Sequence, residues 1–332
     1  MNIMKPSMAS PTARTKRLCM AGAILMIALA VISLLIGKYP LSLEKLLAGD
    51  TMHRRVFTTL RLSRTLVGLI GGFALGASGF VYQTVFRNPL ASPDIIGVSS
   101  GASAGAAAGL LFLSGAAAVT AAAFAGAIAA VVLALALASL DRSGKGSAIV
   151  LAGIAVHSLA QTALMGLKLT ADPERELASI EYWIMGSLNG INSYAIRGNL
   201  LLCIICLTAL FLLHRQIILL SAEEGEARTL GVNIGVMRLI VLMIATLTVA
   251  NVVSLTGLIS FVGLLAPHGA RLLTKNNRSS TMLLSGILGA IILLAADILA
   301  RSVAATELPV SIFTSLVGAP FLISLIARRK EA

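Results

Sequence analysis

Long apolar runs separated by short clusters of charge make up most of this chain of 332 residues. The first run, 18–37, holds no charged residue. A helix needs roughly 20 apolar residues to cross the hydrocarbon core of a bilayer, because it rises about 1.5 Å per residue. We predict ten membrane-spanning helices, at 18–37, 62–84, 95–114, 116–139, 147–169, 195–214, 236–256, 258–274, 282–303 and 310–328.

The same runs exclude the other architecture that a bilayer allows. Only α-helices and closed β-barrels satisfy their backbone hydrogen bonds in hydrocarbon. Barrel strands are short and alternate apolar with polar residues, whereas these runs are long and apolar on all sides. We therefore predict an all-α, multi-pass membrane protein. Its membrane domain covers 18–328, between cytoplasmic tails at 1–17 and 329–332.

The charge of the chain fits this class. Charged residues make up 12% of the sequence, against about a quarter in a soluble domain. The net charge of +12 does not indicate nucleic-acid binding, because the basic residues lie in loops without an interleaved aromatic surface. An even number of spans places both ends on one side of the membrane. That side holds 16 of the 26 Lys and Arg residues, so the positive-inside rule assigns it to the cytoplasm.

Two loops depart from this charge pattern. The inner loop contains residues 221–231, which predict a short amphipathic helix with an acidic face at Glu223, Glu224 and Glu226. This helix is either a docking surface or a plain solvated turn. The first outer loop is strongly basic, which predicts an acidic partner on that side. Its six basic residues are Lys38, Lys45, Arg54, Arg55, Arg61 and Arg64.

Enzymatic chemistry has little support in the sequence. The chain contains no Gly-x-x-x-x-Gly-Lys-[Ser/Thr] loop, so we expect it not to bind ATP itself. Its four histidines are scattered, and its three cysteines lie in apolar runs. A hydrolytic site would need clustered nucleophiles and bases. We therefore predict no catalytic residue, no metal site and no cofactor bound by this chain.

Polar residues inside the predicted spans are the better candidates for function, because burying them in lipid is costly. His157 and Gln161 lie one turn apart and share a helix face, where they either line a substrate path or form an interhelical hydrogen bond. Asn251 has the same two interpretations. Asp297 and Arg301, also one turn apart, are expected to pair, and Arg301 can also face the outer surface.

Breaks in the apolar pattern predict where helices end. Residues 113–115 (LSG) predict a turn within the Ala/Gly-rich stretch 101–140, which is too long for one helix. Pro89 and Pro267 are expected to end helices near the inner face, with exposed polar turns at 88–91 and 267–271. Irregular backbone at such depths must be buried in protein or face a cavity. These breaks therefore favour a transport path over a simple anchor.

Several motifs in order along about residues 20–328 resemble the permeases of iron-siderophore, haem and cobalamin ABC importers, the FecCD-like family. No single motif is as specific as the series. They are 61–65 (RLSRT), 83–94 (QTVFRNPLASPD), 97–101 (GVSSG), 183–188 (WIMGSL), 226–231 (EARTLG), 261–271 (FVGLLAPHGAR), 307–310 (ELPV) and 318–320 (GAP).

The resemblance implies a complete transport assembly. Members of the family have ten spans per subunit with both ends inside the cell, and two permease subunits, identical or paralogous, pair in the membrane lipid. Two cytoplasmic ATPases, which use ATP and Mg, drive them, and a substrate-binding protein docks outside. The resemblance assigns docking on that protein to Arg61, Arg64 and Arg301. It assigns contact with the ATPase to Ser221, Glu223, Glu224, Glu226, Ala227, Arg228, Leu230 and Gly231.

These observations lead to one principal hypothesis. The chain is expected to be the permease subunit of an ATP-driven importer in a bacterial inner membrane. A ferric siderophore is the expected substrate, and the run 186–190 (GSLNG) resembles siderophore members more than haem members. Haem and cobalamin are the alternatives. A secondary transporter driven by an ion gradient is an alternative of another class, which would predict paired intramembrane acids.

Overall fold

The structure is a computed structural model and describes residues 13–140, 147–191, 193–221, 234–304 and 306–329. These residues form helices and no strand, which confirms the predicted all-α class. The helices are α1 (Ala13–Leu35), α2 (Leu43–Leu47), α3 (Thr51–Arg55), a π-helical turn (Val56–Arg61), α4 (Leu62–Val85), a 3-10 turn (Pro93–Ile96), α5 (Val98–Phe112), α6 (Ala116–Ser139), α7 (Ser147–Thr170), α8 (Glu176–Ile184), α9 (Ser193–Leu212), α10 (His214–Leu219), α12 (Ile234–Thr256), α13 (Val262–Thr274), α14 (Ser279–Ser302) and α15 (Val310–Arg329).

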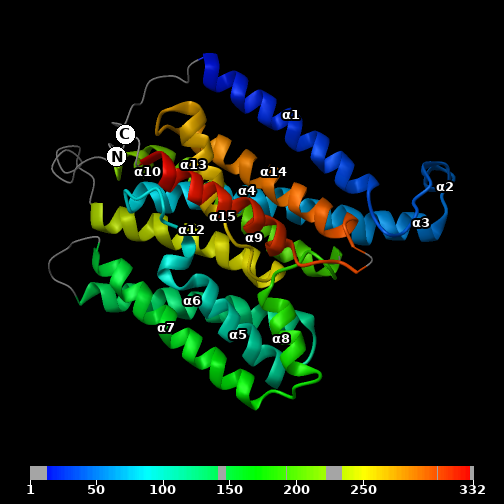
Figure 1. The fold of residues 1–332 in the computed structure, drawn as a ribbon, viewed down its shortest axis with the longest axis horizontal. Helices are drawn as coiled ribbons and strands as arrows, with labels where there is room; N and C mark the ends of the chain where they lie inside the picture. Colours follow the sequence, from blue (N-terminus) through cyan, green and yellow to red (C-terminus); the bar gives the residue numbers. More distant parts are fainter. Residues whose placement is uncertain (1–12, 141–146, 192, 222–233, 305, 330–332) are drawn as a thin grey trace.

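Each of the ten predicted spans overlaps one of these helices. Six helices are long and apolar enough to cross a membrane, and α5, α9 and α15 contain shorter apolar helices. The predicted turn at 113–115 is confirmed, because α5 ends at Phe112 and α6 begins at Ala116. The start of α1 and the end of α15 lie at the same end of the bundle (Figure 1), as an even number of crossings requires.

Helix α4 forms the centre of the bundle, with 19 of its 24 residues buried. Glycines let its neighbours approach closely, as expected inside a membrane. A side chain at Gly72 or Gly76 would collide with the backbone of α14, and one at Gly79 would collide with the carbonyl of Gly263. In Figure 1, α12, α13 and α14 surround α4, whereas α5, α6, α7 and α8 form a second group on the lower side.

Helix α1 lies at the edge of the bundle along α14 (Figure 1). Only 6% of its most apolar stretch is buried within this chain. Apolar contacts within the chain therefore do little to hold α1 in place. Polar contacts at the C-terminal end of α1 do more.

The structure corrects the prediction for Pro267 and residues 267–271. Pro267 lies inside α13, which continues to Thr274. His268 is buried and meets the ring of Phe321 edge-on at 5.6 Å. A proline costs a helix the hydrogen bond to the carbonyl four residues earlier, which here belongs to Gly263. Gly79 of α4 packs directly against that carbonyl. The turn of α13 that contains Pro267 is therefore packed against α4.

Arg271 is half-buried and links α13 to α4 in the same region. Its guanidinium donates to the side chain of Gln83 and, at 2.9 Å, to the hydroxyl of Thr84. It also lies 4.7 Å from the ring centre of Phe80, within cation–π range. The segment predicted as an exposed turn is therefore a packed helix end.

Candidate functional site

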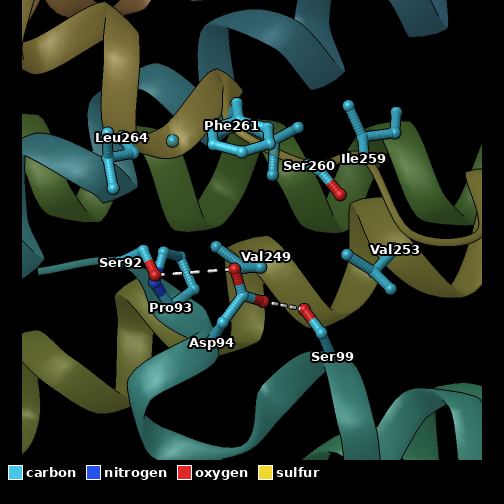
Figure 2. A pocket seen from close by; sticks show the side chains of 12 residues that line it. Ser92, Pro93, Asp94, Ser99, Val249, Val253, Ile259, Ser260, Phe261 and Leu264 are labelled. Carbon is cyan, nitrogen blue, oxygen red and sulfur yellow. Dashed lines mark hydrogen bonds between the residues drawn. The ribbon is translucent and has the colours of Figure 1, made fainter. Parts of the chain in front are cut away.

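A cavity of about 290 Å³ opens inside the bundle near the middle of α4 (Figure 2). Its walls come from α4, α12, the first turns of α5 and α13, and the segments that precede those two helices. The 12 residues that line it are Leu75, Ser92, Pro93, Asp94, Ser99, Val249, Val253, Ile259, Ser260, Phe261, Gly263 and Leu264. The lining is mostly apolar, with hydroxyl groups and one carboxylate.

That carboxylate belongs to Asp94, which is exposed in this chain and is the one ionisable residue among the 12. Figure 2 shows it between Ser92 and Ser99. The hydroxyl of Ser99 donates to Oδ1, and the hydroxyl of Ser92 lies 3.5 Å from Oδ2. A carboxylate offers about four acceptor positions. Two hydroxyl contacts therefore leave part of its hydrogen-bonding capacity available to the cavity.

Two short helices begin at this cavity. Helix α5 follows Gly97, which has φ 86°, and α13 follows Phe261, which has φ 67°. The first N–H groups of a helix have no partner within it and carry a partial positive charge. Irregular backbone deep in a membrane is tolerated where it is buried in protein or lines a cavity. The two helix starts thus lie in the cavity wall, and at α13 the N–H groups of Val262 and Leu264 already donate to the carbonyls of Ser260 and Phe261.

Phe261 has the left-handed backbone conformation that costs a non-glycine residue about 1–2 kcal/mol. Its ring packs on Gly318 of α15, where there is no room for a side chain. The strained turn therefore connects the cavity wall to α15.

A second polar site lies where α4, α14 and the loop before α15 meet. We call its members, Arg64, Asp297, Arg301 and Glu307, the ion cluster. Arg64 Nε donates to Asp297 Oδ1 at 2.9 Å, and Arg64 Nη1 donates to Glu307 Oε2 at 2.8 Å. Arg301 Nη2 lies 3.0 Å from Asp297 Oδ2, which confirms the predicted pair. Asp297 is fully buried, whereas the Glu307 side chain is 19% exposed.

Arginines also hold the C-terminal end of α1. Arg61 donates to the carbonyls of Leu34 at 2.8 Å and Leu35 at 2.6 Å, and also to that of Tyr39. Arg301 donates to the carbonyl of Ile36 at 3.0 Å. The last carbonyls of a helix have no partner within it, and cations interact favourably with that end. The two guanidinium groups therefore anchor the otherwise exposed α1.

The three arginines that the resemblance assigns to docking are thus buried in this structure. Arg61 is 5% exposed, Arg64 9% and Arg301 6%, and each has partners within the chain. By contrast, Arg54 and Arg55 on α3 are exposed. Docking by Arg61, Arg64 and Arg301 stays a prediction.

The short helix α3 presents those exposed arginines. Asp50 caps it by accepting from the backbone N–H of His53 at 2.9 Å, and the His53 ring nitrogen lies at the same distance. Both contacts lower the pKa of Asp50 below its usual value, and the hydrogen bond from the backbone N–H has the larger effect. The ring of His53 is buried edge-on against Tyr39, with centroids 5.4 Å apart. The α3 helix is thereby tied to the segment that follows α1.

None of the three predicted pathway residues lines the cavity. His157 is exposed on α7, and Gln161 is half-buried one turn further on. Asn251 is buried and donates to the carbonyl of Asn199 at 2.6 Å, which is the interhelical hydrogen bond considered as its alternative role. A place for these residues along a transport path stays a prediction.

The predicted ATPase contact falls largely outside the described residues. Ser221 is described, is half-buried, and donates to the carbonyl of Ile218 at 2.6 Å just after α10. The other members lie in 222–233, beyond the described part of the chain: Glu223, Glu224, Glu226, Ala227, Arg228, Leu230 and Gly231.

Sequence reasoning missed Asp94 and Glu307 as site residues. Both stand inside motifs that carry the resemblance, and each is the one acid of its motif. An acid just before a predicted span is expensive unless it has partners or a cavity. Their roles depend on tertiary contacts with Ser99 and Arg64, which no local pattern reveals.

A multi-pass helical bundle with broken helices around an interior cavity defines a membrane transport protein. The chain belongs to the FecCD transport family, whose model matches residues 25–328. It is 32% identical to the molybdate import permease MolB of Haemophilus influenzae, over 93% of this chain and 94% of the relative. It is 34% identical to a permease of Helicobacter pylori named for iron chelatin transport, over 93% of this chain and 97% of the relative.

A solved structure supports the same assignment. The chain resembles a transporter described as a metal-chelate type ABC transporter in an inward-facing conformation. The TM-score is 0.86 and the identity 32%, over 94% of this chain and 99% of that one. Other relatives are named as permeases for hemin, Fe(3+)-citrate and cobalamin. The chain is therefore an ABC importer permease, a transport subunit that works with a separate ATPase and a substrate-binding partner.

Proposed function

We propose that this permease carries a ferric siderophore from an external binding protein to the cytoplasm by alternating access. The cavity where α5 and α13 begin supports a path through the bundle, because broken helices around a cavity are typical of transport sites. The names of several relatives support an iron chelate. A mostly apolar lining suits a bulky chelate that must bind weakly enough to be released.

The proposal includes a full assembly in a bacterial inner membrane. Two permease subunits, identical or paralogous, pair with two cytoplasmic ATPases that use ATP and Mg. Both ends of this chain face the cytoplasm, and the binding protein docks on the opposite side. ATP binding closes the ATPases, and the segment 221–232 passes that motion to the helices. The chain itself binds no cofactor and no nucleic acid.

Reconstitution tests this function directly. The permease, its ATPase and its binding protein are incorporated in liposomes, and uptake of ferric siderophores is compared with uptake of haem, cobalamin and molybdate. We expect ATP-dependent uptake of a ferric siderophore. Uptake of haem, cobalamin or molybdate alone would replace the substrate, and ATP-dependent uptake of none of these compounds would contradict the importer.

The role of residues 221–231 has its own test. Reversing the charges of Glu223, Glu224 and Glu226 together is expected to abolish transport while the ATPase still hydrolyses ATP, because the docking face would repel its partner. The matched control reverses Glu44, an exposed acid far along the chain in α2. Normal coupling in the triple variant would make the segment a plain solvated turn.

An ion-gradient transporter is the second candidate, and Asp94 gives it some support as an acid beside the cavity. Asp297 supports it less, because that carboxylate is held between Arg64 and Arg301. Uptake that an uncoupler abolishes, and that does not depend on the ATPase, would favour this candidate.

A further inference from the structure

The cavity has one ionisable side chain, and nothing basic among its lining residues balances it. Asp94 interacts with the hydroxyls of Ser99 and Ser92, while Ser260 adds a third hydroxyl to the lining (Figure 2). Among the ion pairs found in the described part of the chain, none includes Asp94. Its negative charge is therefore not cancelled by a neighbouring side chain.

Helices α5 and α13 have 15 and 13 residues, and both begin at the cavity. Each helix start is equivalent to roughly half a positive charge. Such ends are ready-made sites for an anion. Asp94 stands three residues before Gly97, at the start of α5, so the chain supplies its own anion at this position.

We propose that Asp94 makes the cavity selective for charge, so that it admits uncharged or cationic groups and excludes anionic ones. An incoming anion would meet the carboxylate of Asp94, which has no basic side chain beside it in the cavity lining. A cation, or a donor such as an amide, would gain the free acceptor positions of Asp94. The substrate side of this inference rests on the proposed importer function.

The inference names a class of iron chelate. Three hydroxamates balance the charge of a ferric ion, whereas three catecholates, which lose two protons each, leave an anion. Asp94 therefore favours a hydroxamate-type chelate, neutral or bearing an ammonium group. It disfavours a catecholate chelate, an anionic carboxylate chelate and an oxyanion such as molybdate. With an effective dielectric constant of about 20, one charge at roughly 8 Å changes a rate on the order of tenfold or more.

Charge-selective labelling tests the cavity without any substrate. Ser260→Cys is introduced after Cys19, Cys203 and Cys206 have been replaced by Ala, and the permease is assembled with its ATPase in liposomes. The thiol is then modified with methanethiosulfonates that carry a trimethylammonium or a sulfonate group. Ser114→Cys, on the exposed turn between α5 and α6, is the matched reporter for the intrinsic reactivity of the two reagents.

We expect the ratio of cationic to anionic labelling at Ser260→Cys to exceed that at Ser114→Cys on the order of tenfold. Asp94→Asn keeps a polar side chain of the same size beside both serines, and it should reduce the ratio to that of the control. Asp94→Glu should restore the preference. Equal ratios at both reporters, a ratio unchanged by Asp94→Asn, or no labelling by either reagent would overturn the proposal.

Uptake then tests the substrate class. Among chelates that the binding protein captures, wild type should transport a neutral ferric hydroxamate in preference to an anionic catecholate, and Asp94→Asn should lose this preference. Unchanged discrimination would overturn the assignment to the substrate. A clear labelling preference without uptake of any chelate would contradict the proposed function and leave the selectivity of the cavity intact.

Discussion

Arg64 and Asp297, 233 positions apart in the chain, form a buried ion pair between α4 and α14, with Arg64 Nε 2.9 Å from Asp297 Oδ1. Arg301 approaches the other oxygen of the same carboxylate. One buried acid thus contacts two guanidinium groups, and Glu307 supplies the second negative charge of the cluster. Removing one member of a buried pair leaves an uncompensated charge, which costs far more than the pair itself contributes.

Asp297→Asn should therefore destabilise the protein by about 3 kcal/mol or more. Both Arg64 and Arg301 would remain buried without their shared anion. The measurement is thermal unfolding of the purified permease in detergent, where we expect a clearly lower midpoint. Glu307→Gln serves as the control, since its side chain is 19% exposed and contacts the same Arg64. Equal losses in the two variants would show that burial of the pair does not determine its importance.

The anchor of α1 gives a second prediction. Arg61→Gln removes bonds to the carbonyls of Leu34, Leu35 and Tyr39, while α1 has few other contacts within this chain. Bonds to a charged donor contribute about 1.5–3 kcal/mol each. We expect amide hydrogen exchange in 34–40 to accelerate on the order of tenfold or more. The matched variant Arg55→Gln, at an exposed position on α3, should leave exchange there unchanged. Similar exchange in both variants would remove Arg61 from the anchor.

Close packing of α4 on α14 gives a third prediction. Gly76 leaves no room for a methyl group, because the backbone of Ser285 and Gly289 occupies that space. Gly76→Ala should lower the unfolding midpoint, since backbone must move to admit the extra atom, at a cost of about 1–3 kcal/mol. Gly166→Ala is the matched control in α7, where nothing lies within 4 Å. That change should be neutral or stabilising, because alanine is the better helix former. Equal effects would contradict close packing at Gly76.

Much of the fold could be predicted from the sequence, because the cost of unpaired backbone in lipid leaves few alternatives. The long apolar runs became helices, and Gly115, with φ 92°, marks the predicted turn before α6. Pro267 could not be placed correctly, since whether a helix continues past a proline depends on how distant segments pack against it. Here Gly79 of α4 packs against the carbonyl of Gly263.

The sites were less predictable for the same reason. A basic loop identifies Arg61 and Arg64, but their partners come from α14, from the loop before α15 and from the end of α1. Whether a guanidinium is free for an external acid therefore depends on contacts between distant segments. Local pairs are the exception, and Asp297 and Arg301, one turn apart on one helix, were predicted to pair and do so.

The contact between Arg64 and Glu307 leads to the last prediction. Glu307 is the partly exposed member of the ion cluster, and it lies in the loop that leads to α15. Its carboxylate holds Arg64 Nη1, the side of the guanidinium that faces away from the buried Asp297 pair. If an acidic side chain of the binding protein docks on Arg64, it must compete with Glu307. Glu307→Gln removes that competitor while it keeps the size of the side chain.

We therefore expect Glu307→Gln to strengthen capture of the binding protein by severalfold, with the larger gain at low salt, where surface charges are less screened. Titration of the labelled binding protein against the reconstituted permease and ATPase measures the effect. Glu174→Gln removes one acid from the exposed segment before α8 and controls for the change in net charge. An equal gain in both variants would show only general attraction. Weaker capture by Glu307→Gln alone would mean that Glu307 positions Arg64 for its partner instead of competing with it.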